Sequence, residues 1–142
     1  AAGTAKVYGS GDRPVPYVSV RDVAEYVVSS VGNAAARDRT IYVKGAPPVS
    51  QRDAVRAFEQ SLGRPLAVTQ VPEEALEAQW RTAADPMTRT FSSLMLGVAR
   101  GGSETYERAD APAAIAPRSV RDYAAELAAG QGAEEGPPHA HA

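Results

Sequence analysis

The side chains best placed for chemistry lie near the amino terminus, where a short apolar segment runs directly into a helix start. Residues 15–18 suit a buried strand, and Ser19 is a helix N-cap residue with Asp22 three positions later. Open α/β sheets bind ligands where the end of a strand meets a helix start. Tyr17 can line such a cleft or donate a hydrogen bond there, so Tyr17 and the adjacent Val18 are the first candidates for ligand contact.

Asp22 and Arg21 have simpler explanations than ligand binding. Asp22 occupies the acidic position of a capping box, and an arginine in the first turn of a helix is usually exposed. The same spacing of serine and aspartate recurs at Ser50 and Ser119. We interpret the three copies as a shared capping pattern rather than an internal repeat, because the intervals between them are unequal.

Complete catalytic constellations are missing from the sequence. His139 and His141 are the only histidines and lie in a Pro-rich tail, so neither is expected to activate a serine. Without cysteine and with no cluster of ligands, a metal site is not expected. The turn at residues 9–11 has two glycines of a dinucleotide fingerprint but leads into prolines rather than a helix. No catalytic or cofactor-binding residue is therefore assigned.

The composition is that of an ordinary globular protein, with 44% hydrophobic and 23% charged residues. A net charge of −2 provides no basic surface for a nucleic acid. No stretch approaches the roughly 18 apolar residues of a membrane span. We therefore expect a cytoplasmic protein without a nucleic-acid or membrane partner.

Caps and periodicity define the elements that must position these side chains. Helices are expected to begin after Ser19, Ser50, Pro72, Asp85 and Ser119, and the last to end at Gly130. Extended segments are expected at residues 7–8, 15–18, 40–43 and 66–71.

Four helices carry apolar residues at helical spacing, which predicts a buried face on each. In the helices after Ser50 and Ser119 these residues include Phe58 and Tyr123. In the first helix these residues are Val20, Val23, Ala24, Val27, Val28 and Val31. In the fourth helix they are Met87, Phe91, Leu94, Met95 and Val98.

The alternation of strands and helices predicts parallel strand pairing with right-handed crossovers. Three strands are few for an independent α/β domain, in which about five or six per sheet are usual. The pattern therefore predicts part of a doubly wound fold.

Several segments resemble one family in order and spacing. The stretch 16–24 resembles the Val-x-Asp-Val-Ala segment of extended and atypical short-chain dehydrogenase/reductase proteins, in particular their NmrA-like branch. Residues 40–50, 62–65 and 117–123 are similar to the family's next strand and helix start, helix end and terminal helix. The resemblance spans about residues 6–128 and concerns only the carboxyl-terminal half of the family.

The resemblance implies an α/β fold with a partial doubly wound, Rossmann-like parallel sheet and a small helical substrate lobe. Residues 1–71 would supply the strands and helices of the Rossmann-like part, 72–130 the helical lobe and terminal helix, and 131–142 a disordered tail. The sequence departs from the family in one large respect, because it contains neither the family's Gly-rich loop nor its Tyr-x-x-x-Lys pair.

For function, the resemblance implies the substrate-side portion of an NAD(P)-binding oxidoreductase that transfers hydride to a small apolar or quinone-like substrate. Substrate contacts are expected from Tyr17, Val18, Trp80, Phe91 and Met95. The chain alone is expected to be inactive and to bind no dinucleotide. Two alternatives stay open: a non-catalytic NAD(P)-sensing regulator of a partner protein, and a sugar-nucleotide epimerase or dehydratase. A homodimer or a protein partner is compatible with the uncovered partial sheet.

Overall fold

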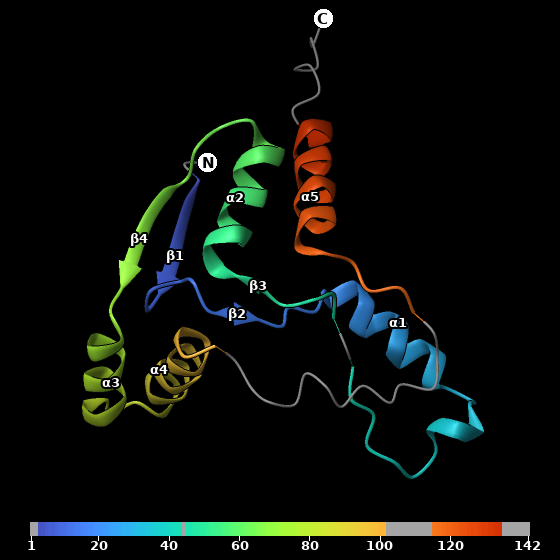
Figure 1. Ribbon diagram of the computed structural model, residues 1–142. Helices are drawn as coiled ribbons and strands as arrows, with labels where there is room; N and C mark the ends of the chain where they lie inside the picture. Colours follow the sequence, from blue (N-terminus) through green and yellow to red (C-terminus); the bar gives the residue numbers. More distant parts are fainter. Residues whose placement is uncertain (1–2, 44, 102–114, 135–142) are drawn as a thin grey trace, which may run out of the picture.

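The computed structural model of the 142-residue chain describes residues 3–43, 45–101 and 115–134 (Figure 1). Its strands are β1 (Thr4–Tyr8), β2 (Pro14–Val15), β3 (Val49–Ser50) and β4 (Ala67–Val71). Its α-helices are α1 (Val20–Ser30), α2 (Gln51–Leu62), α3 (Glu73–Thr82), α4 (Pro86–Ala99) and α5 (Val120–Glu134). A short 3₁₀ helix, η1, spans Ala34–Ala36.

The expected parallel pairing is confirmed between β1 and β4, in which Thr4 lies opposite Ala67 and Tyr8 opposite Val71. The two-residue strands β2 and β3 pair antiparallel in a second sheet. The mixed α/β class with a parallel sheet is therefore as predicted.

Two expected strands are wrong. The strand predicted over 15–18 ends at Val15, because Pro16 has no N–H with which to continue a ladder. Residues 40–43 form no strand, although they are rich in β-branched and aromatic side chains. Such composition supports a strand only where a neighbouring strand pairs with it, and none of the described strands does.

All five predicted helix starts are confirmed. Ser19, Ser50 and Asp85 each accept a hydrogen bond from the backbone N–H three residues on. Gly63 ends α2 in the left-handed conformation, as expected of a C-terminal glycine. The predicted end of the last helix is wrong, since α5 continues through Gly130 to Glu134.

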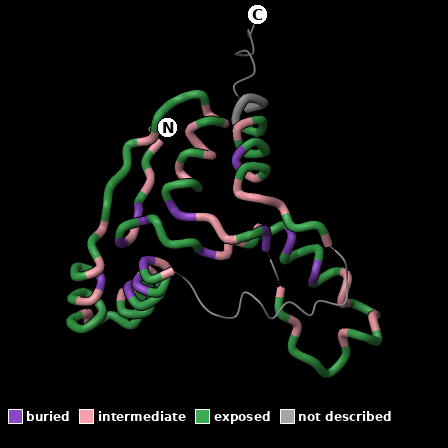
Figure 2. Tube along the Cα trace, in the orientation of Figure 1, coloured by how far each residue is buried: buried purple, intermediate pink, exposed green. Residues whose placement is uncertain are grey.

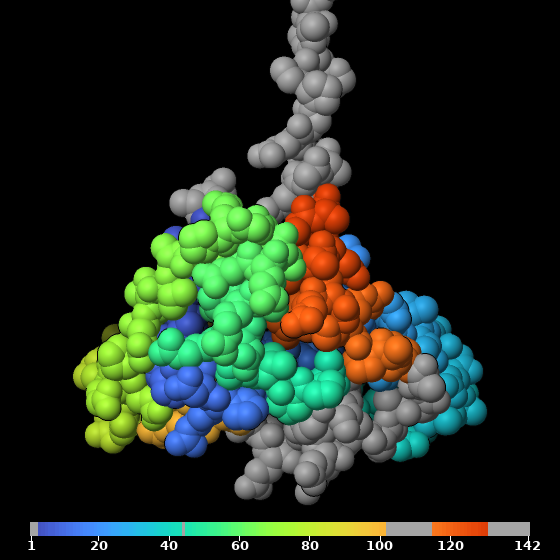
Figure 3. Space-filling model, turned by 45° about the horizontal axis from the view of Figure 1, so that its top comes forward, coloured from blue at the N-terminus to red at the C-terminus, as the bar shows by residue number. Residues whose placement is uncertain are grey.

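The helices surround the β1–β4 sheet unevenly (Figure 1). Helix α2 packs against β1, and α5 packs against α2 (Figure 3). Helices α3 and α4 form a hairpin at the carboxyl ends of β1 and β4. The core of this hairpin consists of Leu76, Leu96 and Ala99, with Tyr8, Val71 and Met95 packed against it.

The predicted buried face of α1 is wrong. Its valines and the adjacent Val31 are 36–81% exposed, and Figure 2 colours most of the helix as exposed. The buried residues of α1 are instead Asp22 and Tyr26. Helical spacing shows which residues share a face, but it does not show whether another element covers that face.

The predicted face of α4 is also wrong in large part. The residues buried by α3 and the sheet are Ser92, Leu96 and Ala99, whereas Met87, Phe91 and Leu94 are exposed. Ser92 is tolerated inside because its hydroxyl donates to Gln79 Oε1 at 2.8 Å. A hydrogen-bonded serine therefore replaces one of the apolar residues that the spacing alone would have placed inside.

Candidate functional site

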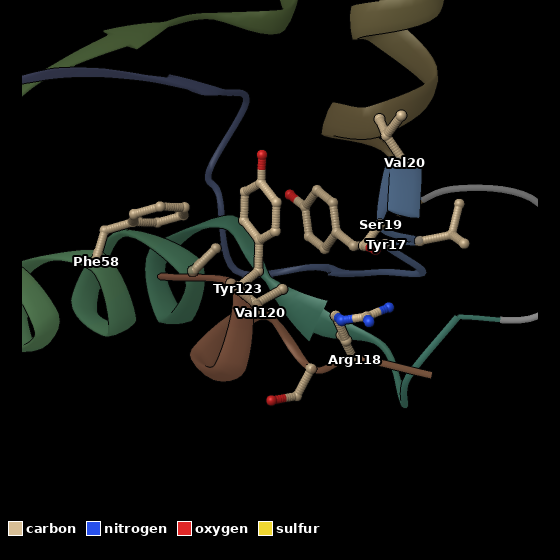
Figure 4. A pocket seen from close by; sticks show the side chains of 10 residues that line it. Tyr17, Ser19, Val20, Phe58, Arg118, Val120 and Tyr123 are labelled. Atoms are coloured by element: carbon tan, nitrogen blue, oxygen red, sulfur yellow. The ribbon is translucent and has the colours of Figure 1, made fainter. Parts of the chain in front are cut away.

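The candidate site is a groove of about 270 Å³, where the starts of α1 and α5 meet α2 (Figure 4). The residues that line it are Tyr17, Val18, Ser19, Val20, Ala54, Phe58, Arg118, Ser119, Val120 and Tyr123. Most of these present apolar surface, and a few polar groups lie among them, which is the usual composition of a small-molecule site.

Aromatic rings form much of the groove wall. Phe58 of α2 and Tyr123 of α5 meet edge to face, with ring centroids 6.4 Å apart and an interplanar angle of 81°. Figure 4 shows the phenols of Tyr17 and Tyr123 with their hydroxyl groups turned toward the same side of the view. The three rings therefore offer flat apolar surface to a ligand of similar shape.

The Tyr17 hydroxyl is a polar group of this wall that forms no hydrogen bond with the described residues. Burial raises the pKa of the Tyr17 hydroxyl, because the phenolate would lose solvation in the groove. Tyr17 is therefore protonated at neutral pH and can donate a hydrogen bond to a ligand oxygen.

Gly45 fixes the backbone that carries Tyr17. A Cβ at position 45 would lie 1.8 Å from the Tyr17 carbonyl oxygen and 3.1 Å from the Val18 Cα, so only glycine fits there. The loop bearing Gly45 thus holds the Tyr17–Val18 segment against the groove, although the expected strand does not form.

Arg118, which lines the groove, belongs to a cluster of charged side chains. Arg118 donates to the carboxylate of Asp22 and, at 3.0 Å, to Glu25 Oε1. Its Nε lies 3.3 Å from Glu126 Oε1, and Glu126 also pairs with Arg21 at 2.8 Å. Hydrogen bonds to Glu25 and Asp22 raise the pKa of the Arg118 guanidinium, which is thus charged and already occupied.

The prediction that capping alone explains Asp22 needs correction. The Asp22 N–H donates to Ser19 Oγ at 3.0 Å, as a cap requires. The carboxylate, however, is fully buried and accepts the backbone N–H of Arg118 at 2.8 Å in addition to the guanidinium. Asp22 therefore joins two segments that are 96 residues apart.

Neither the turn at residues 9–11 nor Arg118 fits the phosphates of a dinucleotide. The turn leads into β2 rather than into a helix, so no helix N-terminus directs backbone N–H groups at a phosphate there. Arg118 has no free guanidinium edge for a phosphate, because three carboxylates surround it. The groove therefore favours a neutral ligand.

Two of the five predicted substrate residues meet in this groove, and three lie elsewhere. Tyr17 and Val18 line it. Trp80 on α3 and Phe91 and Met95 on α4 belong to the hairpin at the carboxyl ends of β1 and β4. The Phe91 ring meets that of Tyr8 at a centroid distance of 6.2 Å, while Met95 packs on the hairpin core.

Sequence reasoning missed Phe58, Arg118 and Tyr123 as groove residues. Phe58 and Tyr123 fit the apolar stripes of α2 and α5, so their spacing indicated only helix packing. Arg118 gave no signal, because its partner Asp22 is distant along the chain. These contacts depend on how α1, α2 and α5 are brought together.

Neither a cluster of metal ligands nor a membrane-spanning helix occurs in the described ranges. Within residues 3–43, 45–101 and 115–134, no three His, Cys, Asp or Glu side chains group as a metal site would require. The helices of this part of the chain are all too short or too polar to cross a membrane.

Comparison with known proteins gives consistent relatives over part of the chain, although no protein-family model matches it. Isoeugenol synthase 1 of Petunia hybrida is 33% identical over 73 residues, which are 49% of this chain and 22% of that enzyme. A bifunctional pinoresinol-lariciresinol reductase of Linum album is 34% identical over 76 residues, 51% of this chain and 23% of that enzyme. The matched segment thus spans less than a quarter of these relatives.

Solved structures match most of the chain. Leucoanthocyanidin reductase of Vitis vinifera in complex with NADPH superimposes with a TM-score of 0.70 at 14% identity, covering 91% of this chain and 47% of that one. An NADPH-dependent quinone oxidoreductase of Escherichia coli gives a TM-score of 0.60 at 13% identity, covering 86% and 46%.

These matches confirm the predicted resemblance to NmrA-like, atypical short-chain dehydrogenase/reductase proteins and their Rossmann-like fold. The chain spans less than half the length of the solved reductases that it matches.

Proposed function

We propose that this chain is the substrate-side portion of an NAD(P)H-dependent oxidoreductase that reduces a small apolar or quinone-like substrate. The observation that carries the proposal is the aromatic groove, which occurs in a chain whose sequence relatives and similar structures include NADPH-dependent reductases.

The proposed role of the groove residues follows from their chemistry. Phe58 and Tyr123 stack against a flat substrate, while the protonated Tyr17 donates a hydrogen bond to a carbonyl or phenol oxygen. The Arg118 guanidinium is already paired with three carboxylates and is therefore not available to bind an anionic competitor. We propose Trp80, Phe91 and Met95 as a second apolar surface for substrate, on the hairpin at the strand ends.

The proposal places the NAD(P) cofactor on residues outside these 142. Its support is that the turn at residues 9–11 leads into a strand rather than a helix, and that Arg118, the cation lining the groove, is already paired with carboxylates. When bound, that cofactor would supply the hydride. The residues of this chain bind and orient the substrate.

A non-catalytic sensor that binds a partner protein is the second candidate. The observation that favours it is the exposed valine face of α1, which offers an apolar surface for protein contact. In that case the groove and the valine face would both be present, but hydride transfer to a quinone would not occur.

Isothermal titration calorimetry tests the proposal directly. We expect the chain to bind naphthoquinone, and to bind neither NADPH nor NADH. Naphthalene is the matched ligand control, because it has the same ring size but no oxygen for Tyr17. Tyr17→Phe should weaken naphthoquinone about five- to tenfold, the size of one hydrogen bond, and leave naphthalene unchanged.

Two results would each contradict one part of the proposed function. Micromolar binding of NADPH by the chain would refute the placement of the cofactor outside it. Equal affinity for naphthoquinone and naphthalene, or no binding of either, would refute the role of the groove.

A further inference from the structure

The starts of α1 and α5 are held together by few contacts other than their charges. Asp22 accepts both the backbone N–H and the guanidinium of Arg118, and Arg21 pairs with Glu126 at the exposed edge. Helix α5 is independently fixed because it packs along α2. Helix α1 is covered less completely: its valine face is exposed, and its buried residues are Asp22 and Tyr26.

We propose that Asp22 and Arg118 are positioning residues for the groove: their pairing holds the Tyr17 side of the groove against the Tyr123 side. The inference rests on the proposed function of the groove, and it adds that the Asp22–Arg118 pair sets the width of the groove. Tyr17 and Val18 directly precede α1, whereas Val120 and Tyr123 lie in the first turn of α5. A pair that joins Asp22 to Arg118 therefore joins the two walls.

The burial of the pair argues for a defined geometry rather than a surface contact. Asp22 is fully buried, and the side chain of Arg118 is only 27% exposed. Both carboxylate oxygens of Asp22 are used, one by the backbone and one by the guanidinium. Such a two-point contact fixes both the distance between the starts of α1 and α5 and their relative orientation, which a single exposed ion pair does not.

The chain contains a matched control for this idea. Ser119-Val120-Arg121-Asp122 repeats the residues of Ser19-Val20-Arg21-Asp22, but Asp122 accepts only from the hydroxyl and N–H of its own cap, Ser119. Asp22→Asn removes a charge that links two helices, and Asp122→Asn removes the same charge from a local cap. Comparing the two variants therefore separates the effect of joining two helices from the effect of capping one helix.

Two measurements test the inference on the folded chain. We expect Asp22→Asn to weaken naphthoquinone binding about tenfold and Asp122→Asn to leave it within about twofold. Ultraviolet titration of the phenols, with Tyr17→Phe as the reference, reports the groove without ligand. Opening the groove in Asp22→Asn should lower the pKa of Tyr17 toward its ordinary value, and Asp122→Asn should not.

The outcomes distinguish this inference from the proposed function. If the chain binds naphthoquinone and Asp22→Asn binds it equally well with an unchanged Tyr17 titration, the positioning role is wrong and the groove assignment stands. If the unmodified chain does not bind it, the groove assignment is wrong, and the Tyr17 titration still decides the role of the pair. If Asp22→Asn does not fold, Arg118→Lys is measured in its place. Lysine keeps the positive charge but lacks the forked N–H donors of the guanidinium, so naphthoquinone affinity and the Tyr17 pKa should change in the same direction by a smaller amount.

Discussion

Helices α1 and α5 begin with the same four residues, Ser-Val-Arg-Asp, and differ in what surrounds them. In both, the serine hydroxyl accepts the N–H of the aspartate, at 3.0 Å in α1 and 3.1 Å in α5. The Asp122 carboxylate stays at its own cap, whereas that of Asp22 is buried against Arg118. A capping pattern therefore predicts the helix start and leaves the use of the carboxylate open.

The apolar faces of the two helices differ in the same way. Ala124 of α5 is fully buried, and Tyr123 packs edge to face on Phe58 of α2. Ala24 has the equivalent position in α1 and is exposed. The same spacing thus buries an alanine where α2 lies beside the helix and leaves its counterpart in α1 exposed.

The largest expected difference lies between the two aspartates. Asp22→Ala should lower the free energy of unfolding by about 3 kcal/mol, because it leaves the Arg118 N–H and part of its guanidinium without an acceptor. Asp122→Ala should cost clearly less, since its carboxylate is exposed to water. Urea unfolding followed by circular dichroism measures both, and equal losses would show that Asp22 acts only as a cap.

Enlarging the two equivalent alanines should give the next largest contrast. Ala124→Leu inserts three carbon atoms between α5 and α2 and should destabilise the chain by about 2 kcal/mol. Ala24→Leu on the exposed side of α1 should change stability by less than about 0.5 kcal/mol. A similar cost at both positions in thermal or urea unfolding would mean that a partner covers α1 in solution.

Acid should weaken the local caps. Hydrogen bonds from Ser119 lower the pKa of Asp122, and those from Ser50 and Thr88 lower the pKa of Asp53 and Asp85. A pKa below the unfolded value adds stability that is fully present above about pH 4 and is lost as the pH falls through the folded pKa. Below about pH 4, the urea concentration at the unfolding midpoint should therefore decrease as the pH falls. The decrease should be smaller in Asp122→Asn. A midpoint that rises on acidification would contradict this sign.

The smallest effect on stability is expected at the valine face of α1. Val27→Thr with Val31→Thr should change the free energy of unfolding by less than about 0.5 kcal/mol, because both side chains are exposed. The pair should instead reduce self-association, which sedimentation velocity measures over a range of concentrations. Association that is unchanged in the double variant would place the contact on another surface, with α4 the next to test.

Much of the local structure could be predicted from residue types. Ser19, Ser50 and Asp85 mark helix starts because their side chains bond to an N–H of the first turn, and Gly63 marks an end because it adopts the left-handed conformation. The substrate roles of Tyr17, Val18, Trp80, Phe91 and Met95 stay predictions. The structure brings only the first two to the groove.

The sequence by itself determined where helices begin, the α/β class and the likeness to a reductase family, because capping, periodicity and motif order depend on neighbours along the chain. Only the tertiary structure decided which apolar faces are covered, why Asp22 is buried, and that Phe58 and Tyr123 share a groove with Tyr17. Burial and long-range pairing depend on which elements meet in space. Two copies of one four-residue pattern, at the starts of α1 and α5, therefore have different uses in the same chain.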